Sequence, residues 1–296
     1  QEYPIDNTET WSSIKLNKSG PMTTMYYGLG NCSEGGVDPE PKTCSTPLIV
    51  FGNPNIPSSV IKSPPNSIKK IVGGKNHTCI LHSWNGGGGS VSCYGFIERF
   101  KPLGSDYCQS TSDVSQYDDS GIQTHFTESY KDIDSSDHHV CAVTTSGYVR
   151  CYGEGDGTNC NRGYNNDYGQ SIPPTGNTFT KVATGKYHTC ALSNTSDAVI
   201  CWGAGQPTDG YIWPHYEQSS FTSSGKYSLV SGDYHTCSIF NGQITCIGKN
   251  THTQTDITGN SVSASTSNFI DTGSNHSCVV SGTNYNTIIC SGSNFY

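Results

Sequence analysis

The chain has 296 residues, with 16 Lys and Arg against 24 Asp and Glu, which gives a formal net charge of −8. This acidic balance argues against nucleic acid and anionic membranes as partners, because both attract basic surfaces. Fourteen cysteines beside two methionines indicate disulfides made in an oxidising compartment, so we expect a secreted, extracellular protein. No apolar run approaches the ~20 residues that cross a bilayer, so no membrane insertion is expected.

The predicted elements begin with an N-terminal strand and a first repeat that covers residues 12–52. Here Thr23-Thr-Met25 and Val50-Phe-Gly52 stand where later repeats carry cysteines. Both cysteines are replaced together, which is what a direct pairing of the two positions predicts. Trp11-Ser-Ser-Ile-Lys-Leu16 resembles the strand that precedes each later repeat, so we expect residues 1–20 either to close the final blade or to pair with a neighbouring subunit.

Five further repeats follow, each with a His-x-Cys segment and then a Cys-x-Gly segment. In His188-Thr-Cys190-Ala-Leu192 alternate residues share one face, and a turn then leads to Val199-Ile-Cys201-Trp-Gly, which predicts an antiparallel hairpin. The first cysteine positions are spaced by about 40 to 60 residues, which is typical of propeller blades. We therefore expect an all-β fold, a single β-propeller of six repeats over residues 1–296, with seven blades as the alternative. The later repeats cover 68–96, 131–153, 180–203, 227–248 and 268–292.

The cysteine spacing predicts one disulfide inside each of these five repeats. A cross-strand pair in a hairpin brings two Cα atoms to ~4.5–5.5 Å, which is within disulfide reach. The expected pairs are Cys79–Cys93, Cys141–Cys151, Cys190–Cys201, Cys237–Cys246 and Cys278–Cys290. Four cysteines remain and allow three pairings. We favour the local pair Cys32–Cys44, which leaves Cys108–Cys160.

Five sequons agree with an extracellular location. Each fits the Asn-x-Ser/Thr acceptor pattern for N-glycosylation. They lie at Asn17, Asn31, Asn76, Asn194 and Asn275.

The repeat resembles that of the regulator of chromosome condensation family. Its run Gly-x-x-His-Thr-Cys-Ala-Leu, a glycine-bearing turn and Val-Ile-Cys-Trp-Gly follow the family pattern, and the family's Asn-x-x-Gly-Gln element is best preserved at Asn166-Asp-Tyr-Gly169-Gln170. The resemblance covers about residues 12–296 and implies a ring of antiparallel four-stranded blades. Nucleotide exchange on a nuclear GTPase, the family's best-known activity, is not expected here because the chain is acidic and disulfide-rich.

One histidine recurs in each repeat and invites a metal or catalytic interpretation. Equivalent positions in a ring lie far apart, so we expect each imidazole to hydrogen-bond within its own blade or to the next. Zinc needs three or four converging ligands, and no Cys/His cluster is left once the cysteines pair, so no metal or cofactor is expected. No nucleophile with its base is recognisable, so the chain is not expected to be an enzyme. These histidines are His77, His139, His188, His235 and His276.

Acidic residues are concentrated between the second and third repeats. We interpret this stretch as a solvated loop rather than a set of paired catalytic carboxylates. Its members are Asp113, Asp118, Asp119, Asp132, Asp134 and Asp137.

The best candidate binding site is an aromatic loop after the fourth repeat. Aromatic faces bind sugars and anchor protein partners, although packing on a neighbouring blade explains such a loop equally well. The candidate residues are Tyr211, Trp213, His215 and Tyr216, with Tyr164 and Tyr168 of the preceding loop as weaker members.

Two functions follow from this sequence. The first is a non-catalytic structural subunit of an extracellular coat, matrix or filament, which acts through self-assembly or another protein. The alternative is a soluble recognition protein, either a lectin that binds glycans or a protein inhibitor.

Overall fold

The computed structural model describes most of the repeats and the turns between them. The described ranges are 25–27, 48–50, 68–74, 77–82, 88–95, 126–155, 168–196, 198–207, 213–221, 228–259, 269–281 and 287–293. Within them the chain forms one two-stranded and five three-stranded sheets, all antiparallel. Each predicted repeat contains an antiparallel pair at its expected place, so the all-β fold and its periodicity are confirmed.

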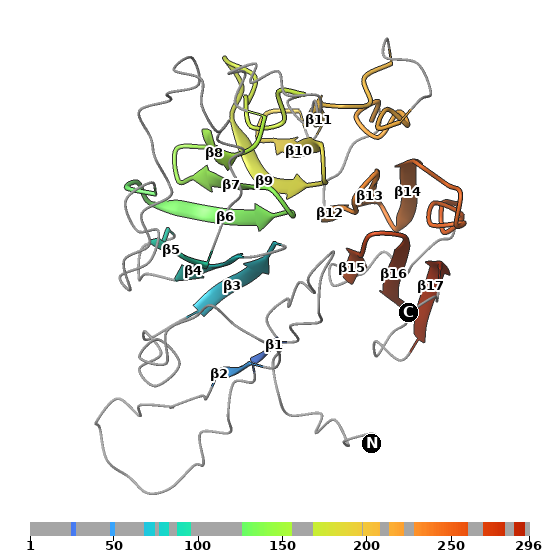
Figure 1. The fold of residues 1–296 in the computed structure, drawn as a ribbon, viewed down its shortest axis with the longest axis horizontal. Helices are drawn as coiled ribbons and strands as arrows, with labels where there is room; N and C mark the ends of the chain where they lie inside the picture. Colours follow the sequence, from blue (N-terminus) through green and yellow to red (C-terminus); the bar gives the residue numbers. More distant parts are fainter. Residues whose placement is uncertain are drawn as a thin grey trace, which may run out of the picture.

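The strands are numbered along the chain (Figure 1). The first pair is β1 (Met25–Tyr27) with β2 (Leu48–Val50). The second and third repeats contain β3 (Ile68–Gly73), β4 (His77–His82), β5 (Val91–Gly95), β6 (Tyr130–Ser135), β7 (His139–Thr144) and β8 (Val149–Gly153). The later repeats contain β9 (Phe179–Thr184), β10 (His188–Ser193), β11 (Val199–Gly203), β12 (Ser228–Ser231), β13 (His235–Phe240), β14 (Gln243–Gly248), β15 (Phe269–Thr272), β16 (His276–Ser281) and β17 (Thr287–Gly292).

The sheets are arranged in chain order around a common centre, with the first strand of each toward it (Figure 1). The first strands β3, β6, β9, β12 and β15 contact one another in that order. Apolar clusters fill the spaces between successive sheets, so each inner sheet is buried on both faces. In β10, Cys190 and Leu192 pack toward β12, whereas Ala191 packs toward the preceding sheet with Val143. This alternation confirms the face assignment made from the sequence.

The fourth strand expected in each blade is not confirmed, because each described sheet that follows the first pair has three strands. Residues 168–178, which lead from β8 to β9, form turns instead of a strand. Pro173 and Pro174 lie in this segment and have no N–H group to donate to a ladder. The N–H groups of Ser171 and Ile172 donate to the carbonyls of Gly155 and Gly169 and close local turns.

Backbone register places the repeat cysteines directly opposite one another, as the spacing predicted. The five disulfides join partners whose Cα atoms are 4.0 to 4.1 Å apart. They are Cys79–Cys93, Cys141–Cys151, Cys190–Cys201, Cys237–Cys246 and Cys278–Cys290. In the first repeat Met25 pairs with Val50, so the two replaced positions also face each other. The other four cysteines, Cys32, Cys44, Cys108 and Cys160, lie outside the described residues, as do residues 1–20.

The repeat histidines connect neighbouring sheets. Nε2 of His139 lies 2.8 Å from the hydroxyl of Thr189 in the next sheet, and that hydroxyl lies 2.8 Å from the carbonyl of Gln170. A threonine hydroxyl has one hydrogen, which goes to the carbonyl, so the imidazole donates its Nε2–H to the hydroxyl. His188 contacts Thr236 at 2.8 Å in the same way. The expected hydrogen bond to the next blade is therefore confirmed at these positions.

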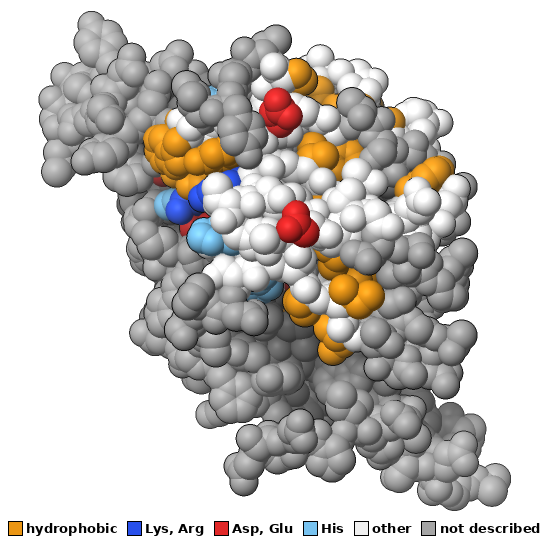
Figure 2. Space-filling model, turned by 90° about the vertical axis from the view of Figure 1, so that its right-hand side faces the viewer, with side chains coloured by type: hydrophobic (Ala, Val, Ile, Leu, Met, Phe, Trp, Pro, Cys, Tyr) orange, Lys and Arg blue, Asp and Glu red, His pale blue; other side chains and the backbone are white. Residues whose placement is uncertain are grey.

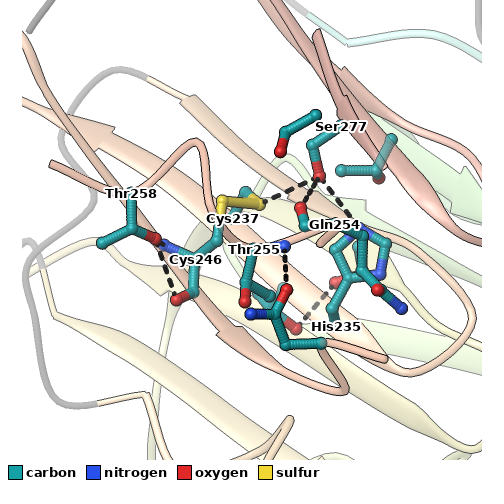
Figure 3. The surroundings of a disulfide bond; sticks show 12 residues. His235, Cys237, Cys246, Gln254, Thr255, Thr258 and Ser277 are labelled. Carbon is teal, nitrogen blue, oxygen red and sulfur yellow. Dashed lines mark hydrogen bonds between the residues drawn. A yellow bond between two sulfur atoms is a disulfide. The ribbon is translucent and has the colours of Figure 1, made fainter. Parts of the chain in front are cut away.

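The same link recurs between β13 and β16 (Figure 3). Ser277 accepts from His235 at 3.0 Å and donates to the carbonyl of Gln254 at 2.8 Å. The third sheet has Val140 where the others have Thr or Ser, and there His77 bonds Ser135, the residue opposite Val140 in the ladder. The position of the hydroxyl can therefore move between paired strands while the link between blades is kept.

The repeat glycine after each second cysteine is required by a close approach of the backbone. Gly203 has a φ of 93°, and a Cβ placed on it would lie 2.6 Å from the carbonyl oxygen of Tyr187. Gly248 has a φ of 111°, and its Cβ would lie 2.4 Å from the carbonyl of Tyr234. A larger residue at either position would therefore separate the end of the hairpin from the turn that precedes the histidine.

The expected solvated acidic loop is wrong for Asp132, Asp134 and Asp137, which are half-buried or buried. Asp132 Oδ2 accepts the N–H of Val182 at 2.9 Å, and Asp134 Oδ2 accepts the N–H of Thr184 at 2.6 Å. Strand β9 is the edge of its sheet, so these carboxylates take the place of a neighbouring strand for its free N–H groups. Asp113, Asp118 and Asp119 lie outside the described residues.

Candidate functional site

One end of the sheets carries a pair of positions that recurs from repeat to repeat. In the third to sixth repeats, the residue before the repeat histidine accepts, with its carbonyl, a hydrogen bond from the N–H of the residue after the repeat glycine. This bond is 2.8 Å long in Ala204–Tyr187 and in Lys249–Tyr234. The equivalent bonds from the N–H of Glu154 to the carbonyl of His138 and from the N–H of Ser293 to the carbonyl of Asn275 are 3.0 and 2.9 Å long. The backbone at these positions is thus held constant while the side chains vary, and we call this end of the molecule the loop face.

A buried glutamine builds the second feature of the loop face. The side-chain oxygen of Gln170 accepts the N–H of Tyr168 at 2.9 Å, and that of Gln218 accepts the N–H of Tyr216 at 2.7 Å. In both turns the residue between has a positive φ, 74° at Gly169 and 62° at Glu217. The hydrogen bond to the glutamine side chain stabilises the positive φ of Glu217, which residues other than glycine rarely adopt. Both turns aim a tyrosine at the neighbouring blade.

These turns bring together aromatic side chains of the fourth and fifth repeats and of the segments that precede them. Tyr187 lies at the centre, with its ring centroid 5.5 Å from Tyr168, 6.0 Å from Trp213 and 5.8 Å from Tyr234. His215 lies 5.3 Å from Tyr168, and Tyr216 lies 5.6 Å from Tyr234. Most of these pairs are edge-to-face, which is a favourable geometry for aromatic rings. We call this set the aromatic surface: Tyr168, Tyr187, Trp213, His215, Tyr216 and Tyr234.

The members of the aromatic surface differ in exposure. Tyr187 is buried at the base, whereas Trp213 is 59% exposed and donates its Nε1–H to the hydroxyl of Tyr234 at 3.4 Å. His215 is held from behind, because the N–H of Gly205 donates to its Nδ1 at 3.1 Å. Burial raises the pKa of Tyr187 above its usual range, and the nearby Tyr234 adds to this effect, so the phenol is neutral at physiological pH. The surface is therefore a supported platform with one open indole.

Two lysines lie beside the aromatic surface, and their ammonium groups have different neighbours: carboxylates at Lys186 and tyrosine rings at Lys249. Lys186 Nζ lies 3.5 Å from Asp137. Burial would lower the pKa of Lys186, but Asp233 and Asp137 outweigh it and raise the pKa. Lys249 Nζ lies over the rings of Tyr216 and Tyr234, 5.5 and 5.2 Å from their centroids. No carboxylate within the described part of the chain forms an ion pair with Lys249.

A mixture of apolar and cationic side chains is visible from outside. Figure 2 shows a face of the molecule on which a group of hydrophobic side chains lies beside Lys or Arg and His side chains. Uncharged polar side chains and backbone make up most of the rest of its described surface, and acidic side chains there are few.

The structure brings together four of the six residues predicted to bind a ligand. Trp213 and Tyr216 of the aromatic loop lie against Tyr234, and His215 lies against Tyr168. The loop thus packs on a neighbouring blade and also keeps an exposed ring. Tyr164 and Tyr211 lie outside the described residues.

Sequence reasoning missed Tyr187, Tyr234 and the two lysines. The missed signal is positional: Tyr187 and Tyr234 both stand directly before a repeat histidine, and Lys249 directly follows a repeat glycine. Reading across the repeats at these two positions, instead of along the chain, would have found three of the four. The proximity of Lys186 to Tyr187, by contrast, is simple sequence adjacency.

Other kinds of site receive no support from the described residues. None of their His, Cys, Asp and Glu side chains form a group of three or more that could hold a metal ion. The same part of the chain contains no helix long and apolar enough to cross a lipid bilayer.

Comparison with known proteins identifies the fold. No protein-family model matches the chain, and no curated protein sequence matches it either. Among solved structures, the ectodomain of the Physcomitrella patens receptor kinase CR4 matches over 92% of this chain and 60% of its own, with a TM-score of 0.53 and 19% identity. Yeast RCC1 (Prp20) bound to Kap60 matches over 84% and 59%, with a TM-score of 0.50 and 17% identity. Human WBSCR16 matches over 94% and 75%, with a TM-score of 0.51 and 13% identity.

These neighbours establish an RCC1-like propeller repeat fold, as the motif resemblance implied. The chain spans about 60% of the length of the first two of these proteins. Identities below one fifth carry the fold and leave the function to be argued from the site.

Proposed function

We propose that the chain is a secreted, non-catalytic recognition protein that binds a protein partner through its aromatic surface. The observation that carries the proposal is the supported cluster of aromatic rings with Trp213 exposed by 59%. Tyr and Trp are the residues most enriched at the centres of protein interfaces, where a few anchors supply most of the binding free energy. The platform is preorganised, so little ordering of side chains opposes binding.

A protein partner fits this surface better than a sugar does. Sugar sites combine an open ring face with polar side chains that bind neighbouring hydroxyls. Here Trp213 is the exposed ring, whereas Tyr187 is buried and Tyr216 and Tyr234 are covered by Lys249. The set spans two successive repeats and the segments that precede them, an extent that suits a macromolecular partner. Yeast RCC1 in complex with Kap60 is an example of a protein with this fold that binds another protein.

Secretion and ring closure belong to the same proposal. Five disulfides within sheets suit an oxidising compartment. Asn194 is exposed at the β10–β11 turn, where a glycan would be accommodated away from the aromatic surface. That the six repeats form one ring, and that residues 1–20 close it or pair with a neighbouring subunit, stays a prediction. The structural role expected first from the sequence, as a subunit that acts through self-assembly or another protein, stays a prediction.

Photo-crosslinking with a matched control tests the function. A photoreactive amino acid at Trp213, exposed to extracellular material from the source, should capture a defined protein. The same photoreactive amino acid in place of Tyr148, which is 51% exposed at the opposite end of its sheet, should not capture this protein. With the partner purified, Trp213→Ala should weaken binding about thirtyfold, as expected for an interface anchor worth about 2 kcal/mol. Tyr148→Ala should leave the affinity within about twofold. Equal capture at both positions, or wild-type affinity of Trp213→Ala, would overturn the proposal.

A further inference from the structure

We infer that the aromatic surface selects an acidic protein segment, and that Lys249 is the residue that reads its carboxylate. This inference rests on the proposed function, because it concerns the same surface and names the chemistry of the partner.

The first step concerns which cation is available to a partner. Lys186 is already compensated, since it lies between Asp137 and Asp233 and forms an ion pair with Asp137 at 3.5 Å. A second carboxylate brought to Lys186 would meet both of those negative charges. Lys249, by contrast, forms no ion pair with a carboxylate of the described residues, and its ammonium contacts two tyrosine rings.

The second step concerns the position of Lys249. Its backbone N–H is fixed to the carbonyl of Tyr234 at 2.8 Å, so its Cα cannot move away from the platform. Its ammonium lies over Tyr216 and Tyr234, and Tyr234 also accepts the indole N–H of Trp213. The cation that forms no ion pair with the described residues therefore shares Tyr234 with the exposed indole. A partner that packs an apolar side chain on Trp213 brings its neighbouring residues within reach of Lys249.

The third step concerns the energetics of the complex. A cation covered by an interface loses water, and without an opposite charge this loss weakens binding. A carboxylate in the partner offsets that loss, and a lysine in the partner would add repulsion. Cation–π contacts with the rings of Tyr216 and Tyr234 hold the ammonium at this position whether the partner segment is acidic or basic. The structure thus favours a segment with an apolar anchor flanked by Asp or Glu.

The test is a selection from a random peptide library displayed on phage, carried out on the folded, disulfide-bonded protein. Peptides that bind the wild type but not Trp213→Ala are selected for sequencing, since they bind at the aromatic surface. Among them, the wild type should enrich Asp and Glu, whereas Lys249→Glu should enrich Lys and Arg. For individual acidic binders, Lys249→Met should weaken affinity roughly fivefold, as expected for one partly exposed ion pair. Added salt should narrow this difference.

A control variant with the same change of charge distinguishes an ion pair at Lys249 from an effect of the net charge of the protein. Lys69 is exposed on β3 and away from the aromatic surface, so Lys69→Glu alters the total charge equally. It should leave the wild-type enrichment unchanged. If Trp213-dependent binders show no acidic enrichment, or if Lys249→Glu and Lys69→Glu behave alike, the inference fails while the proposed function stands. If no binder depends on Trp213, the proposed function itself fails.

Discussion

Removing one hydroxyl between two blades should measure how much the histidine links stabilise the fold. We choose Thr189→Val, which keeps the shape of the side chain and removes its only polar atom. In the wild type this hydroxyl accepts from His139 at 2.8 Å and donates to the Gln170 carbonyl at 2.8 Å. The carbonyl keeps a second bond from the Trp202 indole at 2.8 Å, so the loss falls mainly on the imidazole.

The expected cost is about 2 kcal/mol. His139 and Thr189 are both fully buried, so the Nε2–H loses this acceptor at a site where bulk water does not replace it. An unsatisfied buried donor costs ~1–3 kcal/mol, and at this chain length each kcal/mol lowers the melting temperature by about 2–4 °C. The free energy of unfolding, measured in guanidinium with the disulfides intact, should therefore fall by about 2 kcal/mol.

Two control variants sharpen the measurement. Thr189→Ser retains the hydroxyl and should cost clearly less than Thr189→Val. Thr180→Val removes a hydroxyl that makes one long bond of 3.4 Å to the Leu192 carbonyl, and it should cost less than ~0.5 kcal/mol. If Thr189→Val is as stable as these two, the reasoning is refuted. The alternative would then be that Thr184, which lies opposite Thr189, takes over the bond as Ser135 does opposite Val140.

Two other predictions concern alkaline pH and the repeat glycine. Burial raises the pKa of Tyr130 to about 12, above the ~10 of an unfolded chain. The unfolded state loses this proton first, so Tyr130 alone should lower the free energy of unfolding by about 2 kcal/mol as the pH rises from ~10 to ~12, and Tyr187, whose pKa is also raised, should add to the fall; full tyrosinate absorbance near pH 10 in the folded protein would contradict this. Gly203→Ala should cost at least ~2 kcal/mol because of its φ of 93° and the Tyr187 carbonyl at 2.6 Å, whereas Gly176→Ala, with a φ of 79° and no atom within 4 Å, should cost about 1 kcal/mol. Equal losses in guanidinium unfolding would remove the backbone clash as the cause.

Local patterns allowed much of the fold to be predicted. The cysteines of a hairpin are joined by its register, so their spacing was sufficient for all five described disulfides. Even the first repeat, which lacks both cysteines, pairs Met25 with Val50 as expected. The fourth strands were expected from the resemblance alone, and residues 168–178 form turns because their N–H groups are used locally or are missing in proline.

The acidic residues show where local reasoning failed. A run of Asp before a strand looks solvated, since a carboxylate loses hydration when it is buried. Asp132 and Asp134 are nonetheless packed against β9, because that edge strand supplies N–H donors that no sequence pattern within residues 131–137 announces.

The sequence by itself determined the repeat, the hairpins, their cysteine pairs and the inward alternation of side chains. These depend on residues within one blade, where strand period and turn length set the contacts. Only the tertiary structure decided which aromatic residues form a surface and which lysine forms no ion pair with the described residues. Tyr187 and Tyr234 are one repeat apart in the chain, and Lys186 is neutralised from both neighbouring blades, by Asp137 and Asp233. Such contacts exist only once the blades are set side by side, because the distance between them is fixed by packing and not by the chain.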